Sequence, residues 1–173
     1  RRNDVNIREV KTWLPLLETL NVKELSNNDF IFSAHAKGVR HETQESHIKY
    51  WALCMYHANL HDWNLVRQYL EKFLAVGIFR RYNAFNTITN FCWHFSGTFF
   101  WWRPYDIINR GNWKVVDQAF FGTESWLGHQ MPPDYSACLF NDNCDDLYHK
   151  NYWDHIVLPQ WYKMYDKDSL NEN

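Results

Sequence analysis

The sequence predicts a mixed α/β domain with few strands. Several stretches carry apolar residues at three- and four-residue steps, which indicates helices, and short apolar runs typical of strands lie between them. A length of 173 residues allows a single domain, residues 1–173, with a sizeable core. Three or four strands are too few for a complete doubly wound sheet. We therefore expect a few-stranded sheet flanked by helices, in a chain that is a fragment without its N-terminal part.

The first element is a predicted helix over residues 4–20, whose start Asp4 or Asn6 can cap. Pro15 lies inside this helix, so a kink or a break into two pieces is expected. A turn at residues 27–29 then leads into a buried strand over residues 30–36. The apolar face of the helix is formed by Ile7, Val10, Leu14, Leu17 and Leu20.

The middle of the chain predicts two paired helices, over residues 44–59 and 62–75. A short strand over residues 76–79 and a polar loop over residues 80–90 follow. Residues 95–102 form the strongest strand pattern in the chain.

The C-terminal part predicts a short helix that Pro104 opens and Gly111 ends. Residues 129–134, which contain two consecutive prolines, predict a loop. Residues 145–165 are largely helical by pattern, with an interruption at Pro159.

Composition excludes some classes of function. A net charge of −2 and a pI near 6.5 give no basic field that would attract nucleic acid. No apolar run approaches the roughly 20 residues that span a bilayer, and no signal-peptide pattern opens the chain. The four cysteines lack paired spacing, so reduced thiols and a cytoplasmic location are expected.

Aromatic residues are unusually frequent, with ten Trp, ten Tyr and twelve Phe. They predict either a core rich in rings or a surface groove that stacks on sugars or bases. Strand alternation in the aromatic segment 93–103 places Phe99 and Trp101 on one face and Phe100 and Trp102 on the other. One pair can anchor the core while the other lines a pocket; the alternative is a buried strand whose rings only pack.

Polar residues within the aromatic segment favour a ligand site. Gly97 allows the backbone to approach a ligand closely, because glycine has no Cβ. His94, Ser96 and Arg103 add polar groups that packing does not need.

Glu124 is the candidate catalytic base. It lies two residues before Trp126, and an indole beside a carboxylate would raise the carboxyl pKa towards the range of a general base. The alternative is a structural Glu124 that caps a helix or pairs with Arg103 or Arg110.

Lys37, with His35 and Gly38, follows the strand predicted at residues 30–36. A lysine at the C-terminal edge of a strand suits a phosphate or carboxylate, although most such lysines are only solvated. His57 and His61 have the i, i+4 spacing of metal ligands, but no third ligand is visible, so the sequence favours an exposed or packed pair over a metal site.

Three segments, His35–Val39, Trp93–Arg103 and Phe121–Gly128, occur in an order that resembles a group of glycosyltransferases. The resemblance runs from about Glu9 to Pro159. It implies similarity to the C-terminal, acceptor-side part of nucleotide-sugar transferases of the GT-A fold. It also implies an N-terminal nucleotide-binding part that the chain, residues 1–173, lacks. The implied partners are a nucleotide-sugar donor and a glycan or other hydroxyl acceptor, with a homo-oligomer or the missing N-terminal domain as protein partners.

The resemblance implies roles for particular residues. Glu124 would be the base, and Lys37, Gly38 and His35 would hold the donor phosphates. A C-terminal histidine, His149 or His155, would help to hold a metal or the diphosphate. The sugar and acceptor would contact His94, Ser96, Gly97, Thr98, Trp101, Trp102 and Trp126.

One departure from the resemblance concerns the metal. These enzymes usually bind a divalent Mn or Mg ion through an Asp-x-Asp motif, and none precedes the aromatic segment here. Either the motif lies in the missing N-terminal part, or Lys37 neutralises the diphosphate, or the chain does not catalyse transfer. The alternative function is a non-catalytic carbohydrate-binding or protein-interaction module.

Overall fold

The computed structural model describes residues 10–34, 46–82, 93–118, 122–141 and 147–165. They form a mixed α/β fold around a four-stranded sheet of order β1-β5-β2-β6. Strand β5 is antiparallel to β1 and β2, whereas β6 is parallel to β2. A second sheet pairs β3 with β4. The strands are β1 (Ile31–Ser33), β2 (Ala75–Gly77), β3 (Arg80–Arg81), β4 (His94–Phe95), β5 (Phe100–Trp102) and β6 (Ser136–Cys138).

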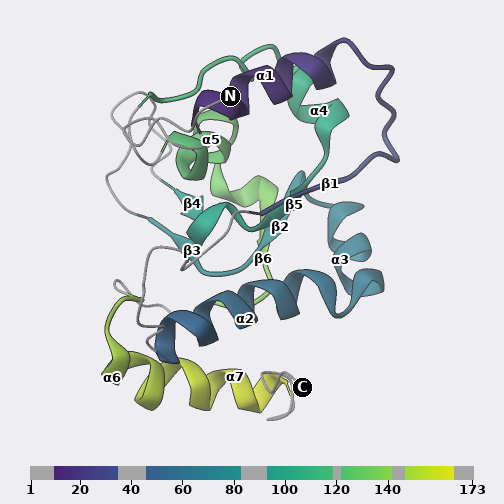
Figure 1. Cartoon of the computed structure of the whole chain (residues 1–173). Helices are drawn as coiled ribbons and strands as arrows, with labels where there is room; N and C mark the ends of the chain where they lie inside the picture. Colours follow the sequence, from purple (N-terminus) through teal and green to yellow (C-terminus); the bar gives the residue numbers. More distant parts are fainter. Residues whose placement is uncertain (1–9, 35–45, 83–92, 119–121, 142–146, 166–173) are drawn as a thin grey trace.

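Helices cover the sheet on both sides (Figure 1). Helices α1, α4 and α5 lie on one side, α2 and α3 lie on the other, and α6 and α7 lie beyond α2. The bounds are α1 (Val10–Asn21), α2 (Ser46–Leu60), α3 (Trp63–Leu70), α4 (Pro104–Asn109), α5 (Gly122–Gln130), α6 (Lys150–Tyr152) and α7 (Leu158–Met164).

The expected alternation of β5 is confirmed. Phe100 and Trp102 belong to the core cluster shared with α1 and α5. Trp101 packs on the opposite face, against the cluster formed with α3, and Phe99 joins the cluster under α2. Rings on both faces of one strand therefore link the two halves of the core.

The strand predicted over residues 95–102 is not continuous. A 3₁₀ turn, Ser96–Thr98, separates β4 from β5. Gly97 has φ +70° and Thr98 has φ +54°, and a strand cannot continue through left-handed backbone. The segment thus supplies a turn between two short strands.

Two prolines act differently in their helices. Helix α1 runs through Pro15 as one element, so the expected break into two pieces is not seen; burial of Val10 and Leu17 in the core offsets the proline's cost. Pro159 follows the π-helical turn Trp153–Val157. Because proline has no N–H, the helix leaves the i→i−4 pattern here, and the Leu158 N–H bonds the Trp153 carbonyl.

Candidate functional site

The turn Ser96–Thr98 lies at the edge of the sheet where three strands end. Ser33 of β1 and Gly77 of β2 both lie opposite Phe100, the first residue of β5. Cys138, the last residue of β6, lies opposite Gly77. In open α/β sheets, ligands bind beyond the carboxyl ends of the strands. The turn therefore occupies the edge where a ligand is expected.

The turn is enclosed and conformationally unusual. Ser96, Gly97 and Thr98 are all buried, and the Ser96 N–H donates to the Phe79 carbonyl at 3.2 Å. Left-handed backbone at a non-glycine residue costs about 1–2 kcal/mol, and Thr98 adopts it beside Gly97. Such strain persists only where the surroundings hold it, and it is concentrated at functional sites.

Glu124, on helix α5, forms a hydrogen bond with this turn. The side chain projects from the first turn of α5, and its Oε1 accepts a hydrogen bond from the Gly97 N–H at 2.5 Å. The two residues are 27 positions apart in the chain. A carboxylate accepting from a backbone amide makes a charge-assisted bond, stronger than a neutral one. The fold thus joins the predicted base to the predicted glycine loop.

The sequence predicted the Trp126 indole beside Glu124, or a pair of Glu124 with Arg103 or Arg110. In the structure each of these three side chains has a partner of its own. Residues two apart on a helix do not face each other, and the Trp126 indole turns into the core, where it donates to the Trp113 carbonyl at 3.0 Å. Arg103 pairs with Asp106 at 2.6 Å. The Arg110 guanidinium lies 5.1 Å from the centroid of the Tyr135 ring.

The predicted sugar-contacting tryptophans are separated by the fold. Trp102 and Trp126 are 0% exposed and pack edge to face at 5.1 Å, so in this structure neither ring presents a surface to a ligand. Trp101 is partly exposed on the α3 side, where its Nε1 donates to the Asn59 carbonyl at 2.8 Å. His94 is buried in β4, opposite Arg81.

The predicted phosphate-binding residues His35, Lys37 and Gly38 lie outside the described residues. His149 and His155 are exposed on the C-terminal segment, and Figure 1 shows the sheet and α2 between that segment and α5. The structure therefore does not bring these two histidines to Glu124. Across the described part of the chain, no three His, Cys, Asp or Glu side chains form a group that could hold a metal ion.

A pair that the sequence analysis missed lies on α5. Ser125 Oγ is 3.4 Å from His129 Nε2, and Asp117 acts on the same histidine electrostatically. This is the residue set of a serine hydrolase, but Ser125 and His129 are buried and the serine hydroxyl also donates to the Gly122 carbonyl. We therefore interpret the pair as structural, because the Ser125 hydroxyl is bonded within its own helix.

A pH dependence of stability follows from two histidines. Burial, and secondly the charge of His61, lower the pKa of His57 below 6.5. Burial also lowers the pKa of His129, against the opposing effect of Asp117. The unfolded chain then binds more protons than the folded chain, so the free energy of unfolding should fall as pH drops through 6.5. Urea denaturation at pH 7.5, 6.5 and 5.5 measures this loss.

The matched variant for this effect is His57→Gln. We expect a smaller loss of stability between pH 7.5 and 5.5 in the variant than in the wild type, because one of the two histidines no longer titrates. An equal loss in both proteins would contradict the assignment to His57.

The left-handed turn gives a second stability prediction, Gly97→Ala. Alanine is strained at the left-handed φ of this position, and its Cβ would lie 3.2 Å from Met55 Sδ. Gly111→Ala is the control, because Gly111 has φ +85° and nothing lies within 4 Å of its added Cβ. Both substitutions should cost about 1–2 kcal/mol of backbone strain, measured by urea denaturation. Gly97→Ala should cost more, and the opposite order would show that the turn tolerates a side chain.

No helix in the described ranges combines the length and apolar character needed to cross a membrane. Comparisons of the chain with protein-family models, with curated proteins and with solved structures gave no match.

Proposed function

We propose that the chain forms the acceptor side of a glycosyltransferase, which moves a sugar from a nucleotide-sugar donor to a hydroxyl of a glycan or other acceptor. The observation that carries this proposal is the bond between Glu124 and the Gly97 N–H. It joins a partly exposed carboxylate to a strained turn at the carboxyl edge of the sheet. A base beside a close backbone approach is what an acceptor hydroxyl requires.

In the proposed step, Glu124 takes the proton from the acceptor hydroxyl. The hydroxyl oxygen then attacks the anomeric carbon of the donor, and the bond from that carbon to the diphosphate breaks. A carboxylate accepts several hydrogen bonds at once, so the bond from Gly97 is compatible with this role and orients the group. Lys37 is proposed to neutralise the leaving diphosphate.

A divalent metal remains a proposal for the donor side. Metal ions assist such reactions by neutralising phosphate charge. The described residues supply no group of three potential ligands, so they do not form a complete protein site for Mn or Mg.

A non-catalytic carbohydrate-binding module is the second candidate function. It is favoured by Trp101, which is partly exposed on the α3 side of the sheet and needs no carboxylate to stack on a sugar ring. In that case the Glu124–Gly97 bond only holds the turn, and a carboxylate near the N-terminus of a helix is stabilising in any case.

Incubation with a panel of nucleotide-sugars separates the two functions. The full chain would be mixed with UDP-, GDP- and dTDP-linked hexoses, with Mn²⁺ or Mg²⁺, and with oligosaccharide acceptors, and the products would be read by mass spectrometry. We expect transfer to an acceptor or hydrolysis of one donor. Oligosaccharide binding without consumption of any donor would instead support the non-catalytic module.

A further inference from the structure

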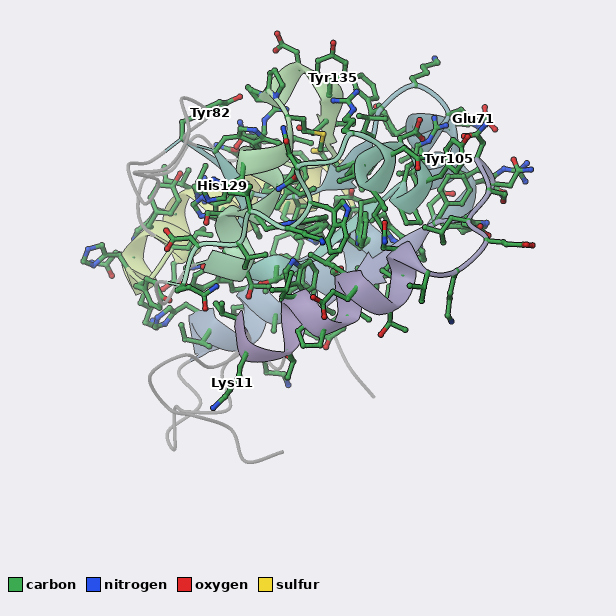
Figure 2. The ribbon with its side chains drawn as sticks, turned by 90° about the horizontal axis from the view of Figure 1, so that it is seen from above. Lys11, Glu71, Tyr82, Tyr105, His129 and Tyr135 are labelled. Atoms are coloured by element: carbon green, nitrogen blue, oxygen red, sulfur yellow. The ribbon has the colours of Figure 1, made fainter. Side chains whose placement is uncertain are left out.

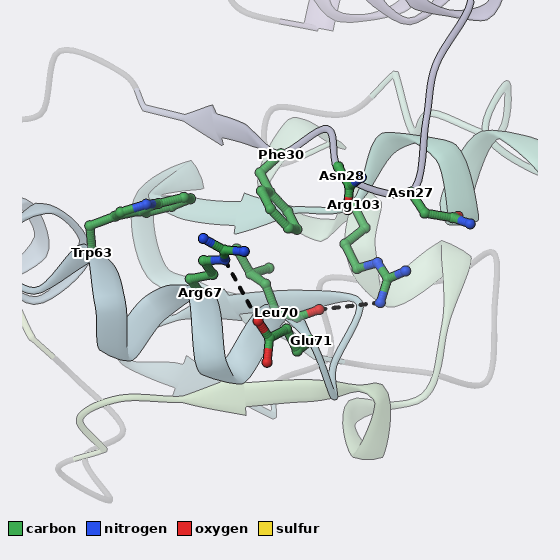
Figure 3. A pocket seen from close by; sticks show the side chains of 8 residues that line it. All are labelled: Asn27, Asn28, Phe30, Trp63, Arg67, Leu70, Glu71 and Arg103. Carbon is green, nitrogen blue, oxygen red and sulfur yellow. Dashed lines mark hydrogen bonds and ion pairs between the residues drawn. The ribbon is translucent and has the colours of Figure 1, made fainter.

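A cleft of about 550 Å³ opens on the α3 side of the sheet. Its volume lies within the roughly 300–1,000 Å³ typical of small-molecule sites. Figure 3 shows its wall of aromatic, amide and guanidinium groups, contributed by α3, by the turn before β1 and by the residue after β5. We call it the α3 cleft; its walls include Asn27, Asn28, Phe30, Trp63, Arg67 and Arg103.

The aromatic surface of the α3 cleft is both exposed and fixed. Trp63 is 40% exposed, yet its ring lies 4.9 Å from the centroid of Trp101 and 5.9 Å from that of Phe30. Trp101 is in turn held by its hydrogen bond to Asn59. An indole supported in this way offers a flat surface at little cost in side-chain entropy.

The polar groups around this surface are also held in place. The turn that carries Asn27 and Asn28 is closed by Asp29, whose Oδ2 accepts from the Ser26 N–H at 2.6 Å. The Arg103 guanidinium donates to the Leu70 carbonyl at 3.2 Å (Figure 3). Amide and guanidinium groups beside an aromatic face match a sugar ring, which has an apolar C–H face and hydroxyls at its rim.

Charge decides which kind of sugar fits. Each guanidinium of the cleft is matched by a carboxylate: Arg67 lies 3.6 Å from Glu71, and Arg103 lies 2.6 Å from Asp106. An acidic ligand would need uncompensated positive charge, which these pairs do not leave. Paired ions instead act as hydrogen-bonding groups for neutral hydroxyls.

We propose that the α3 cleft binds a neutral oligosaccharide, with one sugar ring stacked on Trp63 and hydroxyls bonded by Asn28 and Arg67. This site is separate from the Glu124 turn. Figure 2 shows Glu71, beside the cleft, and His129, on α5, well apart in the molecule. The inference goes beyond the proposed transfer reaction, because it assigns a second sugar site that needs no catalysis.

The test is binding of neutral tetrasaccharides to the full chain. Cellotetraose, maltotetraose, mannotetraose and chitotetraose would be screened by saturation-transfer NMR and titrated by calorimetry, beside the acidic trigalacturonate. We expect at least one neutral tetrasaccharide to bind. Trp63→Ala should weaken that binding at least about tenfold, because one ring supplies most of the apolar contact.

Three further variants make the result decisive. Asn28→Ala, in an exposed turn, should weaken binding while leaving the thermal unfolding midpoint unchanged, which guards against misfolding of Trp63→Ala. Tyr82→Ala, which removes an exposed ring just after β3, and Glu18→Gln, an exposed change on α1, should bind as the wild type does. The proposal is overturned if no neutral tetrasaccharide binds at millimolar concentration, if Trp63→Ala and Asn28→Ala bind normally, or if only trigalacturonate binds and salt abolishes that binding.

Discussion

Trp102→Ala should lower the free energy of unfolding by about 3–5 kcal/mol, the usual cost of removing a large aromatic side chain from a core. The Trp102 ring is 0% exposed and lies edge to face with Trp126. Its Nε1 donates to Ser33 Oγ at 3.0 Å, which ties β5 to β1. Since domains of this size have roughly 5–15 kcal/mol of stability, a large part would be lost. Urea denaturation followed by circular dichroism measures the change.

Trp102→Phe and Trp63→Ala are the matched controls. Phenylalanine retains most of the ring and should recover a substantial part of the lost stability. Trp63 is 40% exposed, so its replacement should cost far less than that of Trp102. If Trp102→Ala unfolds at the same urea concentration as the wild type, the ring is not part of the core. A ligand role would then again be the better explanation of Trp102.

The elements that the sequence predicts well are those with local signals. Pro104 at the start and Gly111 at the end bracket α4 as expected, and Gly111 has the positive φ of a helix terminator. The turn at residues 27–29 forms through the Asp29 carboxylate. The helices predicted over residues 44–59 and 62–75 correspond to α2 and α3, although α3 ends at Leu70.

Other elements carry no local signal. Helix α5 has a buried residue at every position except Glu124, so no apolar stripe marks it as a helix. Strand β6 is only Ser136–Cys138, without a β-branched or aromatic residue. Its place beside β2 depends on pairing across some 60 residues, which no short window of sequence contains.

The same division applies to the candidate site. Sequence reasoning selected Gly97 and Glu124, but their contact depends on where α5 packs, and a long-range hydrogen bond leaves no periodic trace. It also predicted that Trp102 and Trp126 contact the ligand, whereas both rings are buried in the core. Composition does not distinguish a core ring from a surface ring. The α3 cleft could not be predicted from the sequence, because three separate segments of the chain form its walls.

Glu124→Gln should reduce sugar transfer or donor hydrolysis at least about a hundredfold, within the usual contribution of a general base. The amide oxygen of glutamine can still accept the Gly97 N–H, so the turn should stay in place. Exchanging a charge-assisted bond for a neutral one should cost only about 1 kcal/mol of stability. The measurements are the steady-state transfer rate with the donor found in the panel and the thermal unfolding midpoint of the same preparation.

Two further variants separate chemistry from support of the turn. Glu124→Ala removes the base and also leaves the buried Gly97 N–H without this partner, so it should lose as much activity as Glu124→Gln and about 1–3 kcal/mol more stability. Glu18→Gln, an exposed change on α1, should alter neither quantity. Normal transfer by Glu124→Gln, with loss of transfer only in Glu124→Ala, would assign Glu124 to holding the turn. Equal losses in both Glu124 variants, despite their different stabilities, would assign the effect to the carboxylate and not to the turn, because the turn is held in one variant and released in the other.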